Sequence, residues 1–113
     1  MPFIHVRSTT PIPAKKEQEI IQNLGTTMPL IGKSERWLMS QCEENCHLYF
    51  QGQNDQPIAF ISVALLGSAG EENYAAMTGA LTRIISEALS IAPDHIYVQY
   101  QEASTWGWNG SNF

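Results

Sequence analysis

Apolar residues recur along the first half of the chain in two different periods. Residues 2–7 alternate with a period of two, which is typical of a strand. Residues 9–28 carry a narrow apolar stripe at helical spacing, which predicts an amphipathic helix. Pro29 is expected to end or kink that helix, because proline lacks the N–H that a helix interior needs. Two shorter strands are expected next, at residues 35–41 and 47–51.

The second half repeats this order after a polar break at residues 52–56. Residues 57–67 predict a longer and more continuously apolar strand, which is expected to be central in a sheet. Residues 71–91 form the clearest helical pattern, with apolar side chains three and four positions apart. Two glutamates begin that segment, where the helix dipole favours negative charge. Residues 92–100 predict a final strand.

Each half of the chain is therefore a strand–helix–strand unit, one at about residues 2–52 and the other at 57–113. Crossovers of this kind join parallel strands. The sequence predicts an α/β fold in which two pseudo-repeated β-α-β units form one four-stranded mixed sheet. Both helices are expected on one face, with short edge strands, and residues 1–113 are expected to form a single domain. The other face, with residues such as Phe60 and Tyr97, needs a cover, which favours self-association.

The charge of the chain is acidic: eleven Asp and Glu residues stand against six Lys and Arg residues, for a formal net charge of −5. No basic cluster is larger than Lys15–Lys16, so the pattern argues against nucleic acid or a membrane surface as a partner. No apolar run of about 18 residues occurs, and the first residues lack the order of a signal peptide. A cytosolic (cytoplasmic) protein is expected, and secretion by a route without a signal peptide stays open.

Cys42, Cys46 and His47 lie close enough in the sequence to raise a redox or metal-binding alternative. Three ligands are fewer than the four of a structural zinc site, and the two-residue spacing of redox and zinc motifs is missing. Plain reduced cysteines are therefore favoured, with neither a metal nor another cofactor. Oxidation of the two thiols across a tight turn stays open.

Both ends of the chain carry residues with two interpretations. Pro2 suits the start of a strand, where no ladder donor is needed. A small second residue also usually allows removal of Met1, which would leave Pro2 with a free secondary amine able to act as a base. Trp106, Trp108 and Phe113 are large apolar groups in a segment where chains usually fray. Packing across a subunit boundary, or around a pocket near one, is favoured over packing onto their own chain.

Several short motifs occur in the order and spacing of a known family. They are Pro2, Gly32–Lys33, "LYFQG", "LLG", "APDHIYVQY" and "GWNGSNF". On these motifs the chain resembles the macrophage migration inhibitory factor family, part of the tautomerase superfamily, from Pro2 to Phe113. The resemblance implies a homotrimer in which three sheets line a central barrel and three active sites lie between subunits.

The resemblance also implies a reaction that needs no cofactor and no metal, the keto–enol tautomerisation of phenylpyruvate-type aromatic 2-keto acids. Pro2 would be the catalytic base and acid after removal of the initiator. By the same resemblance Lys33 binds the substrate carboxylate and Leu66 contributes its backbone N–H. Tyr97 and Gln99 correspond to residues that reach into the site of the neighbouring subunit.

A catalytic amine must be neutral near pH 7, and burial among apolar groups or a nearby positive charge favours the neutral form. Lys33 can supply that charge. The residues expected to line the pocket are Phe3, Trp37, Trp106, Trp108 and Phe113. Trp106 is larger than the residue usual at the pocket mouth in the family, and Gln99 replaces an asparagine, so the fit of substrates is expected to differ.

The resemblance leaves a second function open. The chain could be a cytokine-like signalling protein that binds a protein receptor through the trimer surface and keeps a vestigial catalytic site. Surface loops such as residues 42–46 and 53–56 would then carry the specificity. A chain that retained Met1 would be an inactive precursor form or an artefact of expression, because the nitrogen of Pro2 would be an amide without basicity.

Overall fold

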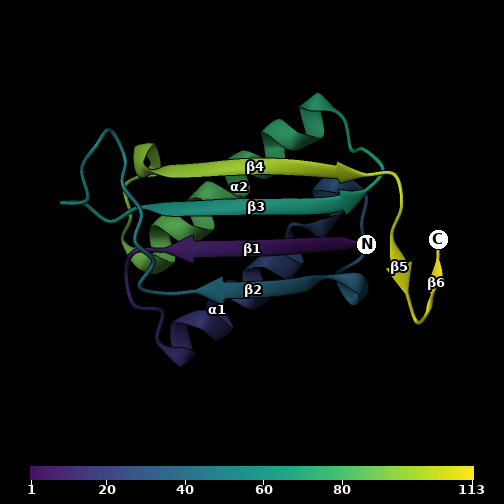
Figure 1. Ribbon diagram of the computed structural model, residues 1–113, viewed down its shortest axis with the longest axis horizontal. Helices are drawn as coiled ribbons and strands as arrows, with labels where there is room; N and C mark the ends of the chain where they lie inside the picture. The colour runs from purple at the N-terminus through teal and green to yellow at the C-terminus, as the bar shows by residue number, and fades with distance from the viewer.

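The computed structural model describes residues 1–113 and contains a four-stranded sheet with two helices behind it (Figure 1). The strands follow the order β2-β1-β3-β4 across the sheet. The main elements are β1 (Pro2–Ser8), α1 (Ala14–Thr26), β2 (Met39–Glu43), β3 (Ala59–Leu66), α2 (Glu71–Leu89) and β4 (Ile96–Ala103). Short elements complete the chain: η1 (Met28–Ile31), η2 (Glu35–Trp37), η3 (Pro93–His95), β5 (Gly107–Trp108) and β6 (Ser111–Asn112).

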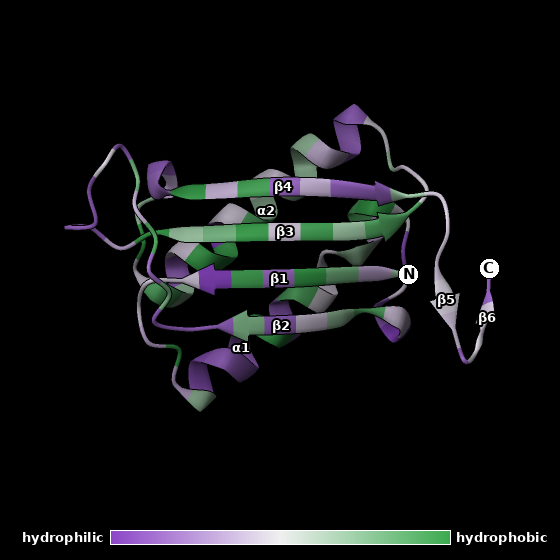
Figure 2. Ribbon diagram, in the orientation of Figure 1, coloured by the Kyte–Doolittle hydropathy of each residue, from purple (hydrophilic) through white to green (hydrophobic).

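Two β-α-β units build this sheet, as predicted. β1 runs parallel to β2 with α1 between them in sequence, and β3 runs parallel to β4 with α2 between them. The units join where β1 and β3 pair in the antiparallel direction. The predicted four-stranded mixed sheet with both helices on one face is therefore confirmed. β3 is central, as expected from its apolar sequence, which Figure 2 shows as a largely hydrophobic strand.

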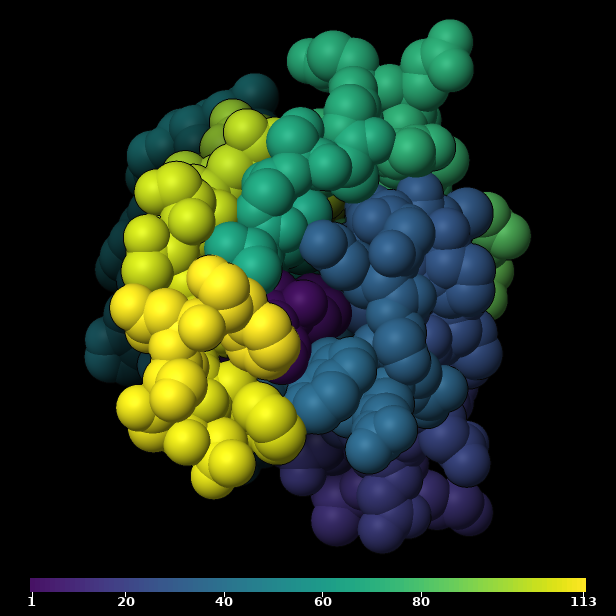
Figure 3. Space-filling model, turned by 90° about the vertical axis from the view of Figure 1, so that its right-hand side faces the viewer, coloured from purple at the N-terminus to yellow at the C-terminus, as the bar shows by residue number.

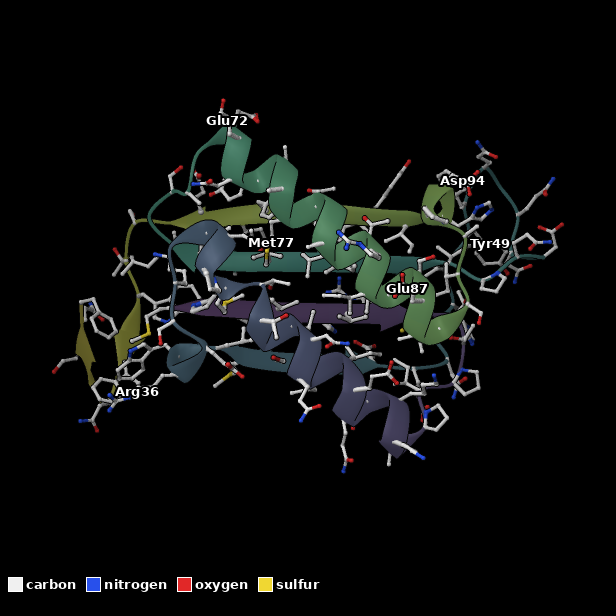
Figure 4. All side chains as sticks on the ribbon, turned by 180° about the vertical axis from the view of Figure 1, so that it is seen from behind. Arg36, Tyr49, Glu72, Met77, Glu87 and Asp94 are labelled. Atoms are coloured by element: carbon white, nitrogen blue, oxygen red, sulfur yellow. The ribbon has the colours of Figure 1, made fainter.

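The core fills the space between the sheet and the helices. Alternate residues of β1 and β3, such as Ile4 and Ile61, point to the helices and are fully buried. Met77 on α2, which Figure 4 shows between that helix and the sheet, is fully buried as well. Burial of such side chains supplies most of the stabilisation of a domain of this size. No helix combines the length and the apolar composition that a membrane crossing requires.

The first helix ends close to where the sequence predicts. α1 stops at Thr26, and Pro29 lies in the 3-10 turn η1 rather than in the helix. Gly32 then ends η1 with a φ of 66°, a left-handed conformation that glycine adopts at little cost. This turn directs the chain toward Lys33 at the end of the sheet where β1 begins.

Two predicted strands differ from the structure. Residues 35–41 begin with the 3-10 turn η2, because the Ser34 hydroxyl accepts a hydrogen bond from the Arg36 N–H, and strand β2 starts only at Met39. Residues 47–51 form no strand. A tight turn with a single bridge between Phe50 and Gln53 replaces the expected strand. The short strands lie instead in the C-terminal hairpin β5–β6.

The sheet face opposite the helices is open in the single chain. Phe60 and Tyr97 pair across β3 and β4 on this face, and Tyr97 is 58% exposed. Met39, on the edge strand β2, is 68% exposed. Large apolar side chains in such positions indicate a partner surface, and the homotrimer that would cover them stays a prediction.

The neighbouring residues Ile20 and Ile21 allow a matched test of the core. Ile20 is fully buried between α1 and the sheet, whereas Ile21 is 36% exposed on the same helix. We expect Ile20→Ala to lower the free energy of unfolding by about 2–5 kcal/mol, because it leaves a cavity. Ile21→Ala should change it by less than about 1 kcal/mol. Urea unfolding at one fixed protein concentration measures both, and equal losses would contradict this packing.

Candidate active site

The N-terminus lies at one end of the sheet, surrounded by segments from the whole chain. Pro2 is the first residue of β1, is buried, and pairs with Leu65 near the end of β3. Figure 3 shows the first residues, in purple, at the bottom of a hollow. The C-terminal hairpin, the segment around η2 and the turn after β3 surround it. Proline is tolerated here because the first residue of a strand can do without a ladder donor.

A cavity of about 370 Å³ opens beside Pro2. Five of the predicted site residues line it: Pro2, Phe3, Trp37, Trp106 and Trp108. The other lining residues are Met1, Arg36, Leu38, Met39 and Gly107. All three tryptophans of the chain are therefore in this one wall. The volume is in the range that small-molecule sites occupy.

The aromatic wall is held together by ring contacts. Trp37 and Trp108 meet edge to face, with ring centroids 4.9 Å apart and planes at 83°. Phe113 stacks on Trp108 with ring centroids 6.2 Å apart and does not itself line the cavity. The N–H of Phe113 donates to the Trp106 carbonyl oxygen at 3.0 Å, which fixes the end of the chain against the hairpin. Ring contacts of this geometry add to the gain from burial.

A polar network lies next to the N-terminus. The Lys33 Nζ donates to the carbonyl oxygen of Leu66 at 3.0 Å, and the Leu66 N–H donates to the Met1 carbonyl oxygen at 3.2 Å. Lys33 and Leu66 are half-buried and do not line the cavity while Met1 is in place. Met1 both lines the cavity and accepts the Leu66 N–H, so it lies next to the cavity and next to Leu66.

This environment acts on the terminal amine. Burial, together with the nearby positive charge of Lys33, lowers the pKa of the Met1 amine below its ordinary value. Both causes disfavour the charged form, as expected at a site that must hold a neutral amine. The same two causes were expected from the sequence for an amine on Pro2, which is more deeply buried than Met1.

Tyr97 and Gln99 lie elsewhere on the same chain. Tyr97 is near the start of β4, where its ring contacts Phe60 and Phe50 with centroids 6.5 and 5.5 Å apart. Pro2 is at the opposite end of the sheet, because β1 runs antiparallel to β3 and β4. Both Tyr97 and Gln99 are exposed on the open sheet face, so within one chain they do not meet the cavity.

Arg36 lines the cavity and was not predicted from the sequence. It lies in η2, with its guanidinium 5.2 Å from the Trp37 ring centroid. The available signal was an arginine between Lys33 and Trp37, two residues already assigned to the site, in a chain with few basic residues. A strand was expected at residues 35–41, and neighbouring side chains of a strand point to opposite faces. Arg36 would then point away from the site that contains Trp37, so it was not assigned to that site.

The other chemical groups form no comparable site. Both cysteines are free, and burial followed by the charge of Glu17 raises the pKa of Cys42 to about 11. Burial is also the main reason that the pKa of Cys46 is raised. Both thiols are therefore protonated at neutral pH and are poor nucleophiles. No group of three His, Cys, Asp or Glu side chains is arranged to hold a metal ion. A wider groove of about 740 Å³ between α1 and β2 contains no predicted site residue.

Comparison with known proteins agrees with this fold. The whole chain, residues 1–113, matches the sequence profile of the family described as macrophage migration inhibitory factor (MIF). Macrophage migration inhibitory factor of Mus musculus is 29% identical over 118 residues, covering 100% of this chain and 99% of the relative.

Solved structures show the same fold. Leishmania major MIF2 superposes with a TM-score of 0.93 and 26% identity, over 100% of this chain and 97% of that one. The homologue from Prochlorococcus marinus gives a TM-score of 0.87 and 25% identity, over 98% of each chain. With a profile match along its full length and this fold, the chain belongs to the macrophage migration inhibitory factor family of the tautomerase superfamily.

Proposed function

We propose that this chain, after removal of Met1, is a cofactor-free keto–enol tautomerase of phenylpyruvate-type aromatic 2-keto acids, with Pro2 as the general base and acid. Membership of the tautomerase superfamily favours an isomerase. The observation that carries the finer proposal is the position of Pro2. It is buried at the bottom of an aromatic-walled cavity, where burial and Lys33 lower the pKa of the terminal amine.

The reaction moves one proton between carbon and oxygen. In the direction from enol to ketone, the neutral Pro2 amine accepts the proton of the enol hydroxyl and then donates a proton to the adjacent carbon. The amine must be neutral to start and must return the proton to finish, so a pKa close to neutrality is the most effective. The lowered pKa of the Met1 amine, one residue away, supports that requirement.

Lys33 and Leu66 are proposed to hold the substrate carboxylate. The Lys33 ammonium donates one of its hydrogens to the Leu66 carbonyl oxygen, which leaves two for a ligand. The Leu66 N–H donates to Met1, so removal of Met1 would release this donor beside Pro2. A positive charge and a backbone donor side by side suit a carboxylate.

The aromatic ring of the substrate is proposed to lie against the tryptophan wall. Trp37 and Trp108 present an edge-to-face pair, and Phe3 and Trp106 complete the apolar lining. Such a wall binds a flat ring and excludes water, which strengthens the electrostatic contacts at Pro2. Phe113 stacks on Trp108.

Removal of Met1 gives the decisive test. We expect protein verified by mass to begin at Pro2 to tautomerise 4-hydroxyphenylpyruvate, followed by ultraviolet absorbance. The Pro2→Gly variant and protein that retains Met1 should lose about 100-fold or more in kcat, since neither has the same base in place. Equal inactivity of all three, with the fold intact by circular dichroism, would reject the proposed reaction and favour receptor binding.

Replacement of Lys33 tests its two roles separately. In protein that begins at Pro2, Lys33→Ala should lower kcat/KM about 10- to 100-fold through the lost carboxylate contact. Loss of the positive charge should also raise the pKa of the Pro2 amine. A raised pKa keeps the amine protonated to higher pH, so the acidic limb of kcat/KM should move upward in pH. The control is Lys16→Ala on the exposed side of α1. An unmoved limb would remove Lys33 from the electrostatics of the base.

Mixed trimers test the proposed contribution of the neighbouring subunit. The Pro2→Gly variant lacks the base, and Tyr97→Ala lacks the residue proposed to reach the adjacent site. Equal mixing of the two variants by co-refolding should restore about one quarter of the sites, because half contain Pro2 and half of those face an intact Tyr97. Activity of the mixture equal to the mean of the separate variants would place Tyr97 outside the site.

A further inference from the structure

Arg36 is the one charged side chain that lines the cavity beside Pro2. The chain has only six Lys and Arg residues and a net charge of −5, so a basic residue here stands out. Lys33 is close to the N-terminal amine but does not line the cavity. The cavity thus has one positively charged side chain, Arg36, in its lining, and a second, Lys33, lies outside the lining near the N-terminal amine.

The guanidinium of Arg36 has no acidic partner. The ion pairs of the chain involve His5, Lys16 and His95. Glu35, the nearest acid in the sequence, lies against α1: a β-carbon at Gly25 would overlap its carboxyl group. The carboxylate next to Arg36 in sequence is therefore directed away, and the hydrogen-bond donors of Arg36 remain available for a ligand.

Local structure holds Arg36 in this position. Its backbone N–H donates to the Ser34 hydroxyl at 3.2 Å, which stabilises the turn η2. Its guanidinium packs over the Trp37 ring at 5.2 Å from the centroid, and Trp37 packs edge to face on Trp108. Figure 4 shows Arg36 at the margin of the molecule, beside the C-terminal hairpin. A cation stacked in this way loses less freedom when it binds an anion than a free side chain would.

Lys33 and Arg36 have different surroundings. Lys33 is half-buried next to Leu66 and Met1, whereas Arg36 is exposed and packs over the Trp37 ring. A ligand ring that lay along the tryptophans would lie next to Arg36, because Arg36 and the tryptophans line the same cavity.

We propose that Arg36 is a second anion-binding residue, and that the preferred substrate is an aromatic 2-keto acid with a second carboxylate on its ring. The substrate class rests on the proposed tautomerase function, while the anion site itself does not. Arginine suits this role because its planar fork pairs with both oxygens of a carboxylate. Exposure to water and salt limits the gain, so we expect a preference of about 5- to 10-fold at low ionic strength.

Inert ligands can test this site without any turnover. 3-Phenylpropanoate has the shape of phenylpyruvate without its ketone and carries one negative charge. 4-(2-Carboxyethyl)benzoate adds a carboxylate on the ring. Because all three tryptophans line the cavity, intrinsic fluorescence reports binding of either ligand directly. The measurements use the full-length trimeric protein that begins at Pro2, at low and at physiological salt.

We expect the dianion to bind about 5- to 10-fold more tightly than the monoanion. Arg36→Met, which keeps the length of the stem without its charge, should remove this preference and change the monoanion Kd by less than about twofold. Arg36→Lys should restore part of it. The matched control is Arg83→Met on α2, which removes a charge away from the cavity and should leave the preference unchanged.

Three results would overturn the proposal. They are equal affinities for the two ligands, no binding of the dianion, and equal weakening of both ligands by Arg36→Met. The last would mean that Arg36 acts only by positioning Trp37. An inactive protein that still prefers the dianion through Arg36 would reject the tautomerase reaction and keep the anion site. An active protein without the preference for the dianion would reject the anion site and keep the tautomerase reaction.

Discussion

The antiparallel pairing of β1 with β3 is the contact on which the site depends. It joins the two β-α-β units and places Pro2 opposite Leu65, at the end of β3. β4 ends at the same side, and the Gly67 N–H donates to the Ala103 carbonyl oxygen at 2.9 Å, so the C-terminal hairpin begins beside the N-terminus. Residues far apart in sequence thus meet around one amine. A shift of this pairing by one residue would turn every side chain of β1 to the opposite face.

Electrostatics at this end of the sheet differ from those of the molecule as a whole. The net charge of −5 would repel an anionic ligand, but Lys33 and Arg36 concentrate positive charge near the cavity. Local fields of this kind decide where a small anion binds, more than the net charge does. Burial first, and then the charge of Lys33, disfavour protonation of the Met1 amine. In the proposed enzyme Lys33 would therefore both bind the acid and keep the amine neutral.

Much of the fold and part of the site could be predicted from the sequence. The strand and helix periods predicted the parallel pairs, and the aromatic tail predicted a pocket wall that contains Trp106 and Trp108. The 3-10 turn at η2 could not be predicted, because local hydrogen bonds override the strand pattern of residues 35–41. The Arg36 N–H donates to the Ser34 hydroxyl, and the Trp37 and Leu38 N–H groups donate to the carbonyl oxygens of Ser34 and Glu35. Arg36 was missed for that reason. Residues 47–51 were expected as a strand from their local pattern, but that pattern does not say whether a partner strand is within reach, and in the structure only Phe50 forms a bridge, to Gln53.

The presence or loss of Met1 decides whether Pro2 only begins a strand or also carries a free amine. The Met1 carbonyl oxygen accepts the Leu66 N–H, so the initiator extends the pairing of β1 with β3 by one hydrogen bond. Such a bond contributes only about 0.5–1.5 kcal/mol. In the proposed enzyme, the loss of Met1 exposes a donor at Leu66 and converts the Pro2 amide into an amine. The rest of β1 remains paired on both sides, so the sheet can tolerate the loss while the site gains its base and a backbone donor.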